Sequence, residues 1–155
     1  IPPTPGAIVT TDGAVVGRHD GVAFYTVGQR HIGEKLGSEN KPFFVVGKNV
    51  NSNELVVGFE DSPLLFAKKI TVSGVNWIGG FIRRSPKGEG GQTPVFPLKC
   101  EVRIRHRQPL QKCTITAEKE GVLHVEFKKS QRAVTPGQFA VFYQSGACLG
   151  GGVIQ

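Results

Sequence analysis

One stretch of the sequence alternates apolar and basic residues. It runs from Glu101 to Gln108 and reads Glu-Val-Arg-Ile-Arg-His-Arg-Gln. In an extended strand, Arg103, Arg105 and Arg107 would share one face at spacings of roughly 6.6–6.8 Å, because alternate residues point the same way. Guanidinium groups so placed repel one another unless an anion screens them, and a phosphate backbone does so with bidentate hydrogen bonds. The stretch therefore predicts a nucleic-acid contact; the alternative is a solvated edge strand whose charges block aggregation.

A second candidate contact is Gln138, which follows a Pro-Gly pair. Pro136 and Gly137 predict a tight turn, and the apolar run Phe139–Tyr143 comes directly after it. A glutamine at the exit of such a turn can donate to and accept from the edge of a base. It can also bond the amides of its own turn, and the residues by themselves favour this structural role.

The remaining patterns that suggest chemistry have simpler explanations. Gly150–Gly152 resemble a phosphate-binding loop, but no Lys-Ser/Thr pair and no helix follow them, so we expect a strand that bends at a barrel corner. The histidines lack the spacing of metal ligands: we expect His124 at the surface, and His19 or His31 bonded to a turn. Since no Ser-His-Asp, Cys-His or paired-carboxylate arrangement stands out, the residues predict a binding domain rather than a catalyst.

The cysteines indicate the redox environment. Cys100, Cys113 and Cys148 are too few and too scattered for a disulfide framework, and no CxxC pair is present. We therefore expect buried, reduced thiols in a reducing compartment.

The charge balance indicates the kind of partner. The chain contains 19 basic and 12 acidic residues, a net charge of +7. Residues 1–74 contain seven of each, so the whole excess lies in residues 75–155. A one-sided positive charge favours a polyanion, either nucleic acid or a membrane surface. No basic amphipathic helix and no run of 18 apolar residues is evident, so we favour nucleic acid.

The elements that would position these residues are mostly short strands. Glycine and proline make up 31 of the 155 residues, which is typical of strands joined by turns. Candidate strands are Ala7–Thr10, Ala14–Gly17, Phe43–Gly47, Glu54–Gly58, Lys69–Trp77, Leu98–Arg107, Lys112–Lys119, Val122–Lys128, Ala140–Gln144 and Ala147–Ile154. Asp12-Gly13 predicts a hairpin between the first two, and Thr26 would cap one helical turn over 26–30.

The spacing of the later strands suits a small barrel or a sandwich. We expect exposed loops at Glu34–Lys41 and Phe81–Gln92, and a domain boundary near Ser73–Asn76. This boundary would divide the chain into domains 1–74 and 75–155. The chain starts at Ile1 and contains no methionine, so we expect a piece of a longer protein.

Four blocks of sequence resemble a known family. They are DGAVVGRHDGVAFYTVGQRHIG (12–33), PFFVVGKNVNSNELVV (42–57), VRIRHRQ (102–108) and AVTPGQFAVFYQSGACLGGGVI (133–154). In this order they resemble the C-terminal portion of the tRNA-specific 2-thiouridylases, the MnmA family. The match runs nearly end to end and is loosest over residues 79–97, which form a Gly/Pro-rich insertion.

The resemblance implies a mainly β fold, in which a small α+β central domain precedes a six-stranded β-barrel like those of translation factors. It also implies a larger cytoplasmic enzyme, or a mitochondrial one in a eukaryote. The upstream part of that enzyme carries an SGGxDS-type loop and uses ATP to adenylate the wobble uridine of tRNA. Two upstream cysteines then handle sulfur supplied by a donor protein. This chain has neither the loop nor counterparts of those cysteines, so we expect it to be inactive alone.

Position by position, the resemblance places tRNA contacts at Arg105, His106 and Gln138, with Arg103 and Arg107 beside them. Because neighbouring residues of an ideal strand point to opposite faces, Arg105 and His106 imply a local bend or a backbone contact. We expect Arg105 to contact phosphate, and His106 or Gln138 to position the backbone or a nearby base. Two alternatives stay open: a docking module for a sulfur-donor protein, and a free-standing translation-factor-like RNA-binding barrel.

Overall fold

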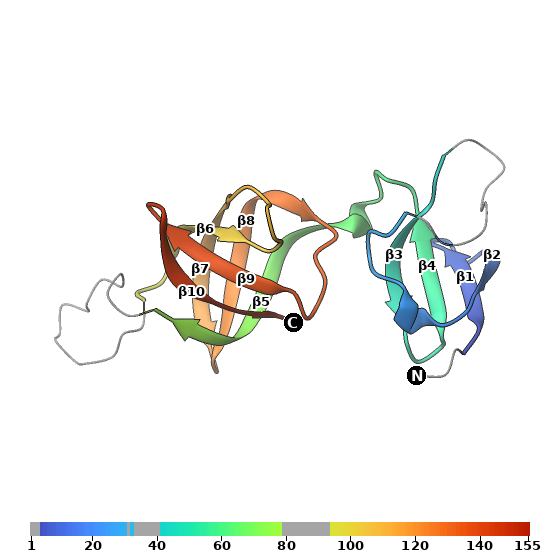
Figure 1. The fold of residues 1–155 in the computed structure, drawn as a ribbon, viewed down its shortest axis with the longest axis horizontal. Coiled ribbons are helices and arrows are strands. Elements are labelled where there is room, and N and C mark those ends of the chain that lie inside the picture. Colours follow the sequence, from blue (N-terminus) through green and yellow to red (C-terminus); the bar gives the residue numbers. More distant parts are fainter. Residues whose placement is uncertain (1–3, 31, 33–40, 79–93) are drawn as a thin grey trace. The chain divides into compact units, whose positions relative to one another are not determined.

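The computed structural model describes residues 4–30, 32, 41–78 and 94–155. His31 and nearly all of the two loops expected at 34–41 and 81–92 lie outside the described residues. The chain forms two compact units, Ile1–Phe66 and Ala67–Gln155 (Figure 1). Within the described residues, no helix is both long enough and apolar enough to span a membrane.

The first unit is built on a four-stranded mixed sheet. Its strands are β1 (Gly6–Thr10), β2 (Val15–His19), β3 (Phe44–Asn49) and β4 (Glu54–Gly58), in the order β2-β1-β4-β3. β1 and β2 form the hairpin predicted at Asp12-Gly13, and β1 also pairs with β4 in parallel. Ile8, Val45, Leu55 and Val57 are buried in its core. The described helical residues of this unit are two short 3-10 helices, η1 (Val22–Phe24) and η2 (Pro63–Leu65).

The helical turn predicted at Thr26–Arg30 is wrong. The backbone here forms a single turn in which the Gln29 amide donates to the Thr26 carbonyl (3.0 Å) and the Gln29 side-chain oxygen accepts from the Thr26 amide (3.1 Å). The Gly28 amide donates to the Val45 carbonyl (2.7 Å), and the Val45 amide donates to the Gln29 carbonyl (3.0 Å). Pairing of Gly28 and Gln29 with Val45 of β3 therefore holds this segment as a turn beside the sheet.

The second unit is a closed six-stranded β-barrel. It contains β5 (Phe66–Trp77), β6 (Leu98–Arg103), β7 (Gln111–Lys119), β8 (Val122–Arg132), β9 (Phe139–Gln144) and β10 (Ala147–Ile154). The order around the barrel is β10-β5-β8-β7-β6-β9 (Figure 1). Alternate residues of each strand point inward, and Val102, Ile115, Phe127 and Phe142 are fully buried there. The mainly β prediction with a six-stranded barrel is confirmed.

The boundary between the units lies earlier in the chain than residues 73–76. β5 pairs with β10 through Val72↔Ile154 and Asn76↔Gly151, so the expected boundary at 74/75 falls inside a barrel strand. Gly74 has φ 59°, yet it lies inside β5, which continues to Trp77. β5 continues past Gly74 because it pairs there with β10, a strand from the far end of the chain.

Gly151 and Gly152 sit where β10 passes between its two neighbours. A Cβ on Gly151 would lie 2.6 Å from the Ala140 carbonyl oxygen of β9, and one on Gly152 would lie 2.5 Å from the Ser73 carbonyl oxygen of β5. These glycines therefore allow close approach of strands within the barrel, whereas the sequence analysis expected them to bend a strand at a barrel corner.

Candidate nucleic-acid interface

The arginine-rich strand ends sooner than its alternation predicts. β6 stops at Arg103, and residues 105–107 form a turn in which the Gln108 amide donates to the Arg105 carbonyl (3.2 Å) and Arg107 has φ 62°. The Gln108 side chain also accepts a hydrogen bond from the Ile104 amide (3.3 Å). This local bond takes an amide that would otherwise continue the ladder. The prediction that Arg103, Arg105 and Arg107 share one strand face is therefore wrong.

Arg103 lies on the outer wall of the barrel. Its neighbours Val102 and Ile104 are buried in the core, which turns Arg103 outward. Its guanidinium carbon lies 5.6 Å from the centre of the Tyr143 ring on β9, within the range of a cation–π contact. Arg103 is thus held against an aromatic ring, apart from the turn that follows it.

Arg105 ties this turn to the end of β8. Its Nη2 atom donates to the Arg132 carbonyl oxygen (2.6 Å) and also to the Ala133 carbonyl oxygen. These two residues begin the segment that leads to the Pro136-Gly137 turn. The structure therefore connects the two segments that the sequence singled out, and we call residues 105–107 and 132–138 together the arginine rim.

Gln138 closes its own turn. Its side-chain oxygen accepts from the Thr135 amide (3.1 Å), and its backbone amide donates to the Thr135 carbonyl (3.3 Å). The structural role favoured by the sequence is confirmed. The side-chain NH₂ group has no partner among the described residues, so it is the part of Gln138 that remains free to contact a ligand.

His106 and Arg107 are the unengaged members of the arginine rim. Both side chains are exposed, and neither bonds to another described residue. A free guanidinium and a free imidazole at a turn are well suited to contact phosphate or a base. Of the five predicted contacts, Arg105 and Gln138 therefore hold the rim together, and His106 and Arg107 are exposed on it. Arg103 lies apart from the rim on β6.

Sequence reasoning missed a chain of glutamines beneath the rim. The Gln108 side chain donates to that of Gln131 (3.0 Å), and Gln131 donates to the side chain of Gln111 (3.2 Å) and to the Lys129 carbonyl (2.8 Å). Gln131 is buried, although glutamine is mostly exposed in proteins. The chain fixes the turn to β7 and β8. No sequence signal marks it, because Gln131 lies 23 and 20 positions away from Gln108 and Gln111.

The two units of the structure differ more in net charge than the two domains expected from the sequence, residues 1–74 and 75–155. Residues 67–155 contain fourteen basic and five acidic residues, a net charge of +9, whereas residues 1–66 contain five and seven, a net charge of −2. On the outer wall, Lys68, Lys99, Lys112 and Lys128 line a groove of about 730 Å³ with Tyr143; its acidic residues are Glu101 and Glu126. The barrel is therefore the basic unit.

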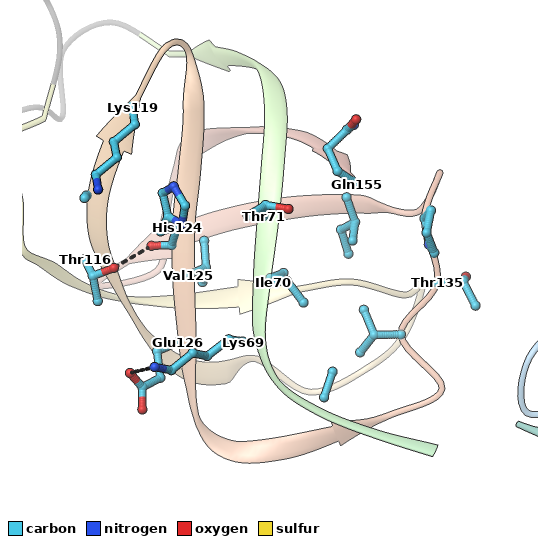
Figure 2. Close-up of a pocket in the computed structure, with 15 residues that line it drawn as sticks. Lys69, Ile70, Thr71, Thr116, Lys119, His124, Val125, Glu126, Thr135 and Gln155 are labelled. Atoms are coloured by element: carbon cyan, nitrogen blue, oxygen red, sulfur yellow. Dashed lines mark hydrogen bonds and ion pairs between the residues drawn. The ribbon is translucent and has the colours of Figure 1, made fainter. Parts of the chain in front are cut away.

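A second groove of similar volume, about 720 Å³, lies across β5, β7 and β8 (Figure 2). Lys69 and Glu126 form an ion pair there at 3.9 Å, and the Thr116 hydroxyl donates to the His124 carbonyl (3.1 Å). His124 is half-buried rather than fully at the surface. The described part of the chain contains no group of three or more metal-ligating side chains.

The buried histidine and the cysteines largely follow expectation. His19 is buried on β2, and its Nε2 atom lies 3.2 Å from the Asn53 carbonyl oxygen in a turn. Cys100 and Cys113 are buried and free, whereas Cys148 is free but only half-buried.

Two family models match the chain, one for each unit. Residues 67–154 match the aminomethyltransferase β-barrel domain, and residues 1–59 match the tRNA methyl transferase PRC-barrel domain. The first match alone covers more than half of the chain. The fold and the rim therefore define a PRC-barrel-type domain followed by an aminomethyltransferase-type β-barrel.

Curated relatives identify the family. The chain is 42% identical to the tRNA-specific 2-thiouridylase MnmA of a Psychrobacter species, with 100% of this chain and 39% of that protein aligned. It is 43% identical to the MnmA of Bacillus subtilis, with 99% of this chain and 39% of that protein aligned. The chain spans about two fifths of the length of these relatives. It belongs to the MnmA family of tRNA-specific 2-thiouridylases and corresponds to their C-terminal portion.

Proposed function

We propose that this chain is the tRNA-binding C-terminal portion of a tRNA 2-thiouridylase. The observation that carries the proposal is the charge of the barrel: it bears +9 while the other unit bears −2. A basic surface draws a polyanion by Coulomb attraction and by release of the counterions condensed on it. The names of the relatives supply the polyanion, a tRNA.

The arginine rim would be the principal contact. Arg107 and His106 project from it, and they would meet phosphate and the adjacent sugar or base. Arg105 contributes its positive charge while its Nη2 atom holds the carbonyls of Arg132 and Ala133. Gln138 would offer its free NH₂ group, and Arg103 would extend the basic surface along β6.

The rest of the reaction would belong to the parent enzyme. ATP would bind and adenylate the wobble uridine in a domain upstream of this chain, and a sulfur-donor protein would deliver sulfur to cysteines there. This places the parent among cytoplasmic sulfurtransferases. In this arrangement the chain supplies substrate binding and no reacting group.

The proposal is tested by tRNA affinity of the intact chain across a salt series. We expect a linear fall of log affinity with log salt, and Arg107→Gln should reduce its slope by about 0.7–0.9 for one lost phosphate contact. Arg18→Gln is the matched control, since Arg18 is an exposed arginine on the acidic unit, and it should leave the slope unchanged. Affinity that does not respond to salt, or equal slopes for both variants, would refute the proposal.

A docking role for the barrel has one observation in its favour. Phe139, at the start of β9 beside Gln138, is 66% exposed. A protein partner would use such an apolar residue, and its binding would be insensitive to salt. Phe139→Ser should therefore leave the salt slope of tRNA binding unchanged. If instead Phe139→Ser abolishes capture of a sulfur-donor protein while Arg107→Gln leaves tRNA affinity intact, the docking role is correct.

A further inference from the structure

Two of the free cysteines face each other across a strand pair. Cys100 on β6 and Cys113 on β7 are directly opposed in a register that runs without a shift from Leu98↔Ile115 to Val102↔Gln111. Their Sγ atoms lie 3.5 Å apart. Since residues of two different strands bring the thiols into contact, the barrel itself creates the pair.

The backbone is already placed for a covalent bond. Directly opposed residues of an antiparallel pair have Cα atoms about 4.5 or 5.5 Å apart, and disulfides span about 4.4–6.8 Å between Cα atoms. Joining the two sulfur atoms therefore requires rotation of the side chains and no change of register. Cys148, which is half-buried on β10, has no such partner among the described residues.

The pair lies in the barrel core but keeps a little exposed surface. Cys100 and Cys113 belong to the buried core cluster and are 7% and 5% exposed, and atoms of both residues contribute to the wall of the lysine-bearing groove of about 730 Å³. A small oxidant would reach the sulfurs through this remaining surface. The two thiols also differ in acidity, because they share one hydrogen bond. With Cys113 as the donor, the pKa of Cys100 is lowered and the pKa of Cys113 is raised. In that arrangement Cys100 is the more acidic sulfur and would become a thiolate first.

We propose that Cys100 and Cys113 form a redox-reactive site that peroxide converts to a cross-strand disulfide. The Cys100 thiolate attacks one peroxide oxygen, the O–O bond breaks, and hydroxide leaves, so that Cys100 becomes a sulfenic acid. The Cys113 sulfur then attacks the Cys100 sulfur, its proton passes to the departing oxygen, and water leaves. Two thiols are oxidised and one peroxide is reduced to two waters in total.

The bond would close a loop that contains the 105–107 turn. Cys100 precedes this turn on β6 and Cys113 follows it on β7, so oxidation would fix both ends of the segment. A thiol reductant would reopen it. The proposal stands on the strand pairing and on the 3.5 Å contact between the sulfur atoms, and it holds whether or not the rim binds RNA.

Peptide mapping of the intact chain tests the proposal without any variant. The folded chain is treated with dilute hydrogen peroxide, free thiols are blocked in denaturant, and the protein is digested with trypsin without reductant. We expect the peptides 100–103 and 113–119 joined, with a mass loss of about 2 Da that a reductant reverses. Recovery of both peptides with blocked thiols, or linkage through Cys148, would overturn it.

Two variants assign the roles of the sulfurs. In Cys113→Ser, the sulfenic acid on Cys100 has no resolving thiol and should be trapped by dimedone on peptide 100–103. Cys148→Ser is the matched control and should form the linked peptides as the native chain does. Dimedone labelling that appears only on Cys148 would contradict the assignment, and circular dichroism of Cys113→Ser confirms that the barrel tested is folded.

Discussion

At the scale of single residues, Arg105 has a structural role and, in our proposal, also adds positive charge to the binding surface. Its Nη2 atom bonds two backbone carbonyls at the end of β8, which lie 27 and 28 positions away in the sequence. Arginine suits this role because its planar fork presents several N–H donors in fixed directions. Arg107 is exposed and free of such bonds, so the two arginines should respond differently to substitution.

We expect Arg105→Ala to lower the free energy of unfolding by roughly 1–2 kcal/mol, since it removes charge-assisted hydrogen bonds to two carbonyls. Urea denaturation followed by circular dichroism measures the change. Arg107→Gln should alter stability by less than about 0.5 kcal/mol, as is usual for an exposed side chain without partners. Equal losses for the two variants would mean that the Arg105 bonds contribute nothing to the fold.

Gln131 is the second residue whose importance is visible only in the structure. It is buried and joins Gln108 to Gln111. We expect Gln131→Leu to lower the free energy of unfolding by about 1–3 kcal/mol, because it leaves two side-chain amides without their partner. Gln155→Leu is the control: Gln155 is exposed, and its side chain makes a single long bond of 3.4 Å. The prediction fails if both leucine variants unfold at the same urea concentration.

At the scale of the elements, closure of the barrel depends on β10. This strand lies between β9 and β5, and its glycines allow both neighbours to approach. A side chain here would push a strand out of the ladder. The sequence Gly150–Gly152 is therefore a packing requirement rather than a ligand loop.

Gly151→Ala should destabilise the chain by about 1–3 kcal/mol, the usual cost of an atom forced into a packed site. The added Cβ would lie 2.6 Å from a backbone oxygen, which cannot rotate away. Thermal unfolding measures the effect. The control is Gly47→Ala in β3, where the nearest atom to a new Cβ is 3.7 Å away, an ordinary contact. A Gly151→Ala chain as stable as Gly47→Ala would show that β10 has room to move.

The end of β6 is a feature that the alternation of apolar and polar residues does not predict. This alternation continues in the sequence to Arg107, whereas the strand ends at Arg103. The Gln108 side chain competes for the Ile104 amide, and Arg105 bonds the end of β8. Such bonds end a strand without any glycine or proline, so the pattern alone could not locate its end.

At the scale of the whole molecule, the two units differ in charge by eleven, from −2 to +9. In our proposal the basic barrel binds the polyanion, and the chemical steps take place outside this chain. The chain has no SGGxDS-type loop. The expected inactivity of the isolated chain is inferred from these two features.

We expect the isolated chain neither to consume ATP nor to form 2-thiouridine in tRNA when a sulfur donor is supplied. The two readouts are released pyrophosphate and the nucleoside composition of digested tRNA. A reaction without protein is the control for spontaneous turnover. Turnover well above this control would place reacting groups within these 155 residues and would overturn the proposed role.

Much of the fold could be predicted because it depends on local patterns. The strands Glu54–Gly58 and Ala147–Ile154 occur as expected, and Asp12-Gly13 makes the expected hairpin. Alternating side chains and turn residues determine the structure of adjacent residues, so the strands and turns that they form can be predicted from one sequence. The basic excess and the absence of a catalytic motif are likewise properties of the residues themselves.

Only the tertiary structure decided how the predicted residues are used. It ended β6 before the arginine turn, placed the unit boundary before β5, and brought Cys100 against Cys113. Each of these depends on contacts between residues that are distant in the sequence: Arg105 with Ala133, β5 with β10, and β6 with β7. Closing the barrel brings such residues together, and no local pattern of side chains records which distant partner each will meet.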